Sequence, residues 1–352
     1  MKKIKTLFFV LSFVLIGLMA TAQNGFDQLV RSSPADATKL VQSFADPLFK
    51  GLGIGLNSGW NNTAETKKIL HFDLRVSANV AMIPTSAKTF DVTQIGLSNH
   101  IQVNPTSLSN ITPTFGGDKN SATPLIDIKD DNGNKIGSFN MPNGVIQYIP
   151  TPNIQLIVGI FKNTDFTIRA TPTIHIGSNA GSVGMIGLGI KHDIIQDIVG
   201  KNANKLIPFN LAIALNYNRL TYSSTLNVQP DKGTQPATSN TVSDFSNQRL
   251  KGNFNGINVQ AIISKKILFF TPFLSVGYQS ANTTFNVLGN FPVSASSGFY
   301  ATMTDPVHIK ENNINNLRTD LGFQLNLFVF RIFASYSPGK YQSANAGIGF
   351  GF

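Results

Sequence analysis

The chain has 352 residues, of which 42% are hydrophobic and only 13% are charged, against roughly 25% charged residues in an ordinary soluble domain. After the first two dozen residues it holds no run of about 18 apolar residues, which excludes a helical membrane protein. It contains 30 Gly, 27 Phe and no Cys. This composition favours many short strands joined by polar turns, and the lack of Cys excludes disulfides and thiolate zinc sites.

Residues 1–22 are predicted to be a cleaved secretory signal. Three lysines among the first five residues precede an apolar run, and a small-x-small cleavage site ends at Ala22. The formal net charge of the whole chain is +10, but no cluster of Lys and Arg with interleaved aromatic residues suggests a nucleic-acid groove. We interpret the basic excess as a solvated surface and expect no nucleic-acid partner.

Residues 23–50 are predicted to form an N-terminal helical segment. Ser33 can cap the helix, Pro34 suits its first position and Asp36 complements its dipole. Apolar side chains recur at helical spacing until Pro47 ends the pattern. The single apolar face of this helix can be buried on the periplasmic side of the barrel predicted below, or inside that barrel as a plug.

From residue 51 onward the hydrophobic period is two. In residues 70–82 an apolar face alternates with a polar one, and the pattern recurs at 209–218 and 317–329. These runs are about ten to thirteen residues long, whereas strands of soluble sandwiches average about five or six. Such lengths suit tilted strands that cross a membrane, where no open edge is tolerated. Residues 51–352 are therefore predicted to form an all-β fold, a closed antiparallel transmembrane barrel.

The number of strands follows from the alternating segments and the turns between them. Twelve strands are expected, near 51–58, 69–83, 88–98, 153–161, 164–177, 182–191, 206–226, 255–264, 270–288, 315–328, 331–337 and 341–352. Three long polar stretches then fall on the outer face and short connections on the inner face, as in outer-membrane barrels. Because residues 99–152 could hold two more strands, we expect about 14, within a range of 12 to 16.

Six charged side chains point into the barrel by the parity of their strands. They are Asp73, Arg75, Arg169, Lys191, Arg318 and Asp320. Inward charges of this kind either form a structural ion-pair network in a filled lumen or line an aqueous path that selects solutes. The sequence leaves both interpretations open.

The sequence predicts no catalytic residues, no metal site and no cofactor. The five histidines lack metal-ligand spacing, and no nucleophile, base and orienting group stand out together. The acidic segment at 127–134 fails as a calcium loop, because Ile128 would occupy the first ligand position. Asn132-Gly133 is better interpreted as a hairpin turn.

The last residues alternate apolar side chains with glycine or polar ones and include Phe350 and Phe352. This pattern resembles the terminal-strand signature by which the outer-membrane assembly machinery recognises its clients. We predict that Phe350 and Phe352 form this assembly signal. Together with the secretory signal, it predicts a Gram-negative outer membrane as the location, with membrane lipid and the assembly machinery as partners.

Residues 51–60, the strand at 70–82 and residues 189–193 resemble those of a poorly characterised family of predicted outer-membrane barrel proteins. A helical segment followed by about 14 strands also resembles the long-chain fatty acid transporter barrels, although their Asn-Pro-Ala element is missing and no ligand residues carry over. Two functions stay open. One is passive transport of a small or hydrophobic solute; the other is a structural, assembly or secretion-associated role without transport. A hydrated lumen would favour transport, and a filled lumen the alternative.

Overall fold

The computed structural model describes residues 26–30, 32–175, 181–199 and 207–352. The predicted secretory signal lies outside these residues. The helices are α2 (Phe26–Leu29), α3 (Pro34–Asn57) and α4 (Ile195–Val199), with 3-10 turns η1 (Thr85–Ala87) and η2 (Val92–Gln94). In the part of the chain so described, no helix has the length and apolar character needed to span a membrane.

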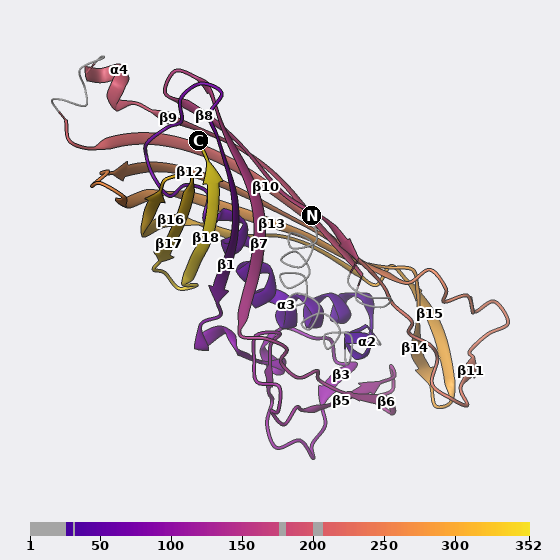
Figure 1. Cartoon of the computed structure of the whole chain (residues 1–352). Helices are drawn as coiled ribbons and strands as arrows, with labels where there is room; N and C mark the ends of the chain where they lie inside the picture. Colours follow the sequence, from indigo (N-terminus) through magenta and orange to yellow (C-terminus); the bar gives the residue numbers. More distant parts are fainter. Residues whose placement is uncertain (1–25, 31, 176–180, 200–206) are drawn as a thin grey trace.

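Ten strands form a closed antiparallel barrel, which confirms the predicted fold class (Figure 1). In order around the barrel they are β1 (Phe72–Met82), β18 (Ser343–Gly351), β17 (Phe330–Ser337), β16 (Val307–Leu327), β13 (Phe270–Leu288), β12 (Arg249–Ser264), β10 (Asn210–Thr225), β9 (Ser182–Asp193), β8 (Thr164–His175) and β7 (Tyr148–Phe161). Pairing of β1 with both β18 and β7 closes the ring.

The prediction of about 14 strands is wrong, because three segments do not enter the barrel wall. Residues 51–57 belong to α3, and the expected strand at 88–98 contains only a short strand, β2 (Thr89–Asp91), followed by η2. Residues 99–152 do hold extra strands, but these pair outside the wall in two small sheets. They are β3 (Ile101–Val103), β4 (Ile111–Pro113), β5 (Leu125–Lys129) and β6 (Lys135–Asn140), and a third small sheet contains β11 (Gln235–Pro236), β14 (Asn290–Ser296) and β15 (Phe299–Thr304).

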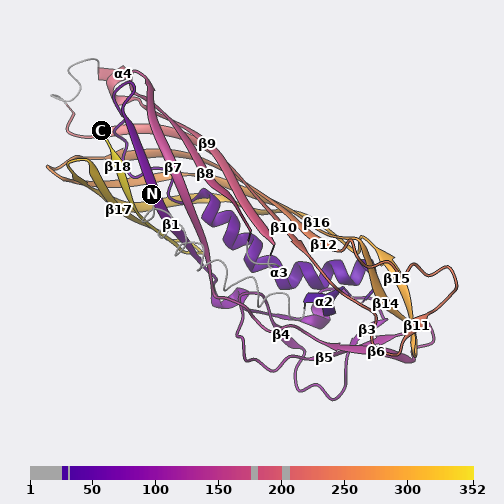
Figure 2. The same cartoon turned by 45° about the vertical axis from the view of Figure 1, so that its right-hand side comes forward.

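The two ends of the barrel differ in the length of their connections. At the long-loop end, three extended segments join β1 to β7, β10 to β12 and β13 to β16, and they carry the small sheets (Figures 1 and 2). At the short-turn end, brief connections join β7 to β8, β12 to β13 and β16 to β17. The predicted asymmetry is therefore present, with two exceptions. Residues 84–87 belong to a long loop and not to a short inner turn, and the β9–β10 connection at the short-turn end is longer and contains α4.

The inward and outward parity predicted for the strands is correct in β16. Leu317 is 78% exposed and Leu321 is 51% exposed on the outside, while Arg318 and Asp320 are each only 5% exposed inside. Similar apolar side chains cover the outside of other strands, such as Ile213 and Leu215 of β10. This apolar exterior is the surface that a lipid bilayer covers in transmembrane barrels.

Helix α3 lies inside the barrel, as Figure 2 shows. At its start, the Asp36 carboxylate accepts hydrogen bonds from the backbone N–H (2.8 Å) and the hydroxyl (2.6 Å) of Ser98 in a long loop. At its end, the Asn57 amide donates to the carbonyl oxygen of Ser280 on β13 (3.0 Å). The helix thus enters at the long-loop end and points toward the short-turn end. Residues 58–71 continue in that direction and lead into β1.

The start of α3 is as predicted, but its end is not. Ser33 accepts a hydrogen bond from the Asp36 backbone N–H, and Pro34 occupies the first turn. Pro47, which was expected to end the helix, lies inside it. An interior proline costs about 3 kcal/mol, and we attribute its tolerance here to burial of the helix within the barrel.

Three glycines account for the wrong strand prediction at 51–58. A Cβ at Gly51 or Gly55 would lie only 2.5 or 2.2 Å from a β7 side chain, and one at Gly53 would lie 2.7 Å from the Cβ of Ala281 on β13. Alternation with period two imitates a strand, but residues four apart share one helix face, so Gly51 and Gly55 face β7 together. The glycines let α3 touch two sides of a narrow lumen. The barrel wall itself begins at β1.

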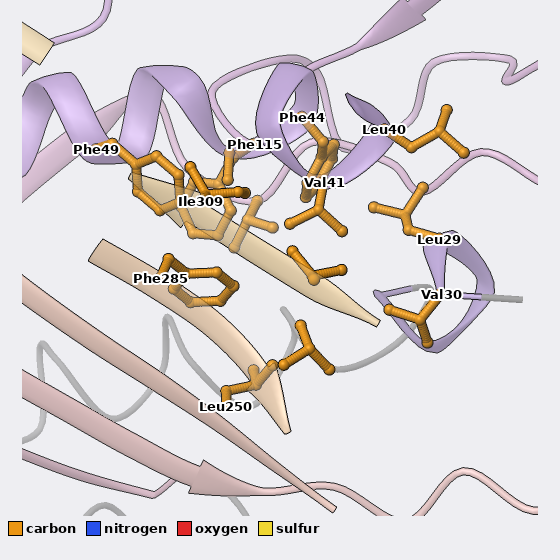
Figure 3. Packing of buried hydrophobic residues seen from close by; sticks show 14 of the residues in the cluster. Leu29, Val30, Leu40, Val41, Phe44, Phe49, Phe115, Leu250, Phe285 and Ile309 are labelled. Atoms are coloured by element: carbon orange, nitrogen blue, oxygen red, sulfur yellow. The ribbon is translucent and has the colours of Figure 1, made fainter. Parts of the chain in front are cut away.

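A large apolar core fills the long-loop half of the lumen (Figure 3). Phe49 of α3 packs against Phe254 of β12 and Phe285 of β13, with ring centroids 5.8 and 5.5 Å apart. Phe44 packs edge-on against Phe115 of a long loop, with centroids 6.1 Å apart. The helix is therefore bound to both the wall and the loops at this end.

Candidate functional site in the plugged lumen

The C-terminal end of α3 is held by a fully buried arginine. Arg169 of β8 donates hydrogen bonds to the carbonyl oxygens of Leu56 (3.3 Å) and Ser58 (3.0 Å) and to the side-chain oxygen of Gln155 (2.9 Å). Its guanidinium also lies 3.8 Å from the ring centroid of Trp60. The last carbonyls of a helix lack helical partners and carry partial negative charge. Arg169 supplies both the donors and the opposite charge.

Two asparagines of the wall complete this attachment. Asn218 of β10 donates to the carbonyl oxygen of Leu56 (2.7 Å), and Asn258 of β12 donates to that of Asn57 (2.9 Å). Three strands therefore contact the end of the helix with polar side chains. Because buried carbonyls are costly to leave unpaired, these contacts fix where α3 stops.

Asp73 and Arg75 form one ion pair at the short-turn half of the lumen. The Arg75 guanidinium lies 2.8 Å from the Asp73 carboxylate, and the Lys67 ammonium lies 3.1 Å from it. Arg75 also donates to the side-chain oxygen of Gln324 across the barrel (3.0 Å). The segment between α3 and β1 is thereby joined to the wall.

Arg318 and Asp320 form a second pair, with their charged atoms 2.7 Å apart. The Asp320 carboxylate also accepts hydrogen bonds from the Gln260 amide and the Ser275 hydroxyl, each at 2.9 Å. Lys191 pairs elsewhere, with Asp165 at 3.2 Å. Within the described residues, the six predicted charges thus fall into four groups, not one network.

Two features of the site were missed in the sequence. Lys67 and Asp165 complete two of the ion pairs, and Trp60 stacks on Arg169. The inward position of Asp165 could have been predicted from the alternation of β8, because Asp165 lies on the same face of this strand as Arg169. Lys67 and Trp60 lie in a segment without regular period, so no sequence pattern placed them in the lumen.

An apolar pocket of about 140 Å³ lies between α3 and the wall in the long-loop half. Ala45, Phe49 and Leu52 line it from the helix, and Met185 and Leu220 line it from β9 and β10. An engineered protein cavity of about 150 Å³ lined by Leu, Ile and Phe stays dry and binds benzene. The pocket is therefore suited to a small apolar molecule.

Phe350 and Phe352 lie at the short-turn end and face outward, 42% and 60% exposed. Phe352 exchanges two backbone hydrogen bonds with Phe72, each 3.1 Å long. The rings of these two residues pack edge-on with centroids 4.6 Å apart. These contacts link the last strand to the first, where the barrel closes.

The acidic turn and the histidines carry no metal-site geometry. Asn132-Gly133 forms the turn between β5 and β6, with Gly133 at φ +82°, as predicted. In the portion of the chain that the structure describes, no group of three or more His, Cys, Asp or Glu side chains could hold a metal ion.

Comparison with known proteins identifies a family and several distant barrels. The chain matches the family described as "Family of unknown function (DUF6588)" over residues 1–352, and no curated protein matches it. The outer membrane protease OmpT from Escherichia coli aligns at 7% identity and TM-score 0.33, covering 82% of this chain and 100% of its own. The translocator domain of autotransporter NalP from Neisseria meningitidis aligns at 10% identity and TM-score 0.29, covering 87% and 94%.

A third structure, the attachment invasion locus protein Ail of Yersinia pestis, aligns at 10% identity and TM-score 0.26, covering 80% of this chain and 100% of its own. At these TM-scores none of the three bears on the role of this chain. The family match confirms the predicted membership of a poorly characterised family.

Proposed function

Because the chain belongs to DUF6588, a family of unknown function, we propose its role from its own geometry: it is an outer-membrane barrel that binds a small apolar solute beside α3 and lets it pass when α3 moves. The apolar pocket carries this proposal. The interiors of membrane barrels are ordinarily polar. An apolar pocket inside the lumen is therefore unusual and favours binding of an apolar molecule. Its volume suits a single aromatic ring or a short hydrocarbon.

The wall and its connections support a location in an outer membrane. The apolar exterior suits lipid, and long loops at one end with short turns at the other are typical of outer-membrane barrels, whose long loops are extracellular. The pocket would then lie near the outer face. Below it, the buried end of α3 and residues 58–68 fill the lumen, so onward passage requires α3 to shift.

A structural role without transport is the second candidate. Arg169, Asn218 and Asn258 all hold the end of α3, and a helix held so firmly would seal the barrel. The filled lumen supports this candidate, as expected from the sequence. The two candidates differ in whether an apolar solute binds and whether α3 moves.

Binding is tested with fluorobenzene and fluorine NMR on the protein in lipid nanodiscs. We expect a saturable bound signal, and we expect Ala45→Leu to abolish it, because Ala45 lines the pocket and the larger side chain fills it. Ala35→Leu is the matched control, since Ala35 is exposed on the same helix and the signal should persist. Absence of a saturable signal in the unaltered protein would refute the apolar-solute proposal.

Phe350 and Phe352 are proposed to engage the outer-membrane assembly machinery. Phe352→Ala is expected to lower the amount of heat-modifiable, folded barrel in the outer membrane several-fold, because it removes the ring that packs on Phe72 and the recognition element together. Phe328→Ala, at a 96% exposed position in a short turn, serves as the control. Equal folded levels for the two variants would contradict this role.

A further inference from the structure

A second pocket, of about 520 Å³, lies between α3 and the β13–β16–β17 side of the wall. Asp46 and Lys50 line it from the helix, Glu311 and Asn313 line it from β16, and Tyr341 lines it from the turn between β17 and β18. This lining is about half polar, whereas that of the first pocket is almost entirely apolar. A cavity needs only about 10–15 Å³ to hold one water, so this one has room for a polar molecule of many atoms.

The charges around this polar pocket are balanced. Asp46 pairs with Lys50 at 2.8 Å, and Arg318 at the base of the pocket is neutralised by Asp320. Glu311 accepts hydrogen bonds from Gln42 and, at 2.7 Å, from the Asn313 amide, and Lys340, of opposite charge, also lines the pocket. A site without net charge attracts neither anions nor cations preferentially, so its chemistry suits a neutral ligand.

Two residues that line the pocket, Tyr341 and Asn313, each carry a buried polar atom without a hydrogen-bond partner among the described residues. Tyr341 is only 8% exposed, and its hydroxyl is unpaired within the described structure; the side-chain oxygen of Asn313 is likewise buried and unpaired. Burial, together with the negative charge of Asp46, raises the pKa of Tyr341, so the hydroxyl keeps its proton and can donate. Leaving such groups unpaired in a protein interior is unfavourable. A ligand that both donates and accepts would satisfy the hydroxyl of Tyr341 and the oxygen of Asn313.

We propose that this pocket binds a neutral, polyhydroxylated molecule of about the size of a monosaccharide. Each ligand hydroxyl can accept from Tyr341 and donate to Asn313 or to the carboxylate of Glu311. The site is separate from the apolar pocket, because α3 lies between the two. The inference therefore does not depend on transport of an apolar solute.

The test is calorimetric titration of the full chain in nanodiscs with D-glucose. Saturable binding is expected, and Tyr341→Phe should weaken it about three- to tenfold, the effect of one lost hydrogen bond. Glu311→Gln should also weaken it. Tyr222→Phe is the matched control, because Tyr222 lines the apolar pocket, and it should leave glucose affinity unchanged.

Heat-modifiable mobility on unboiled gels establishes that each variant is folded. If the unaltered protein shows no saturable glucose binding, the pocket holds water only and the proposal is overturned. It is also overturned if Tyr341→Phe and Tyr222→Phe change the affinity equally. Neither result affects the fluorobenzene signal, so the two proposals fail separately.

Discussion

Arg169→Ala is expected to lower the free energy of unfolding by about 3–5 kcal/mol. The change leaves the carbonyl oxygen of Ser58 and the side-chain oxygen of Gln155 without their donor, and each unsatisfied buried acceptor costs about 1–3 kcal/mol. It also removes the stacking on Trp60. Urea unfolding in nanodiscs, followed by gel mobility, measures the loss.

Arg249→Ala provides the control, because Arg249 is exposed at the start of β12 and surface changes stay within about 0.5 kcal/mol. Arg169→Lys should recover only part of the lost stability. An ammonium group keeps the positive charge but lacks the planar arrangement of N–H donors of a guanidinium group. Equal stability of the Arg169 and Arg249 alanine variants would show that the end of α3 does not depend on Arg169.

An epitope inserted between Gly25 and Phe26 is expected to bind antibody on intact cells. The start of α3 lies among the long loops, where the Thr38 hydroxyl approaches the carbonyl oxygen of Pro306 at 3.5 Å and Asp36 binds Ser98. Those loops are extracellular in outer-membrane barrels. From Phe26 onward the chain would thus pass from the long-loop end inward through the lumen as α3, and return as β1.

Two further insertions calibrate this experiment. An epitope between Asp231 and Lys232, in a long loop, should be detected on intact cells, and one between Lys265 and Lys266, in a short turn, only after permeabilisation. If the epitope before Phe26 behaves like the short-turn insertion while the loop insertion is detected, the direction of α3 through the barrel is wrong.

The wall of the barrel could be predicted from sequence because one physical rule governs every strand. Lipid outside and protein inside impose a period of two, so parity correctly placed Leu321 outside and Arg318 and Asp320 inside. The same rule misled at residues 51–58, where glycines at alternate positions reflect close helix packing. The predicted number of wall strands was too high for a related reason. Short strands in the loops have the same local pattern as strands of the wall.

The candidate site was less predictable than the wall. Parity identified six inward charges but not their partners, because pairs such as Lys191 with Asp165 depend on register between strands. The apolar pocket was not foreseen either. Its lining comes from α3 and the long-loop ends of several strands, including Met185 and Leu220, and only the position of the helix brings them together.

A disulfide between α3 and the wall would test directly whether α3 controls passage. A Cβ at Gly256 would lie 3.2 Å from the Cβ of Leu56, close to the 3.5–4.5 Å of a disulfide, and the chain has no Cys of its own. The double variant Leu56→Cys with Gly256→Cys should therefore form a single disulfide that holds α3 to the wall. This disulfide, called the lock below, can be opened with a thiol reductant.

The decisive measurement is the rate at which intact cells carrying this double variant take up radiolabelled toluene, before and after reduction of the lock. We expect uptake no faster than in cells lacking the protein while the lock is closed, and faster uptake once it is reduced. Equal uptake in the locked, reduced and protein-free cells would contradict transport and favour the structural role; equally fast uptake with the lock open or closed would show that solute passes without movement of α3.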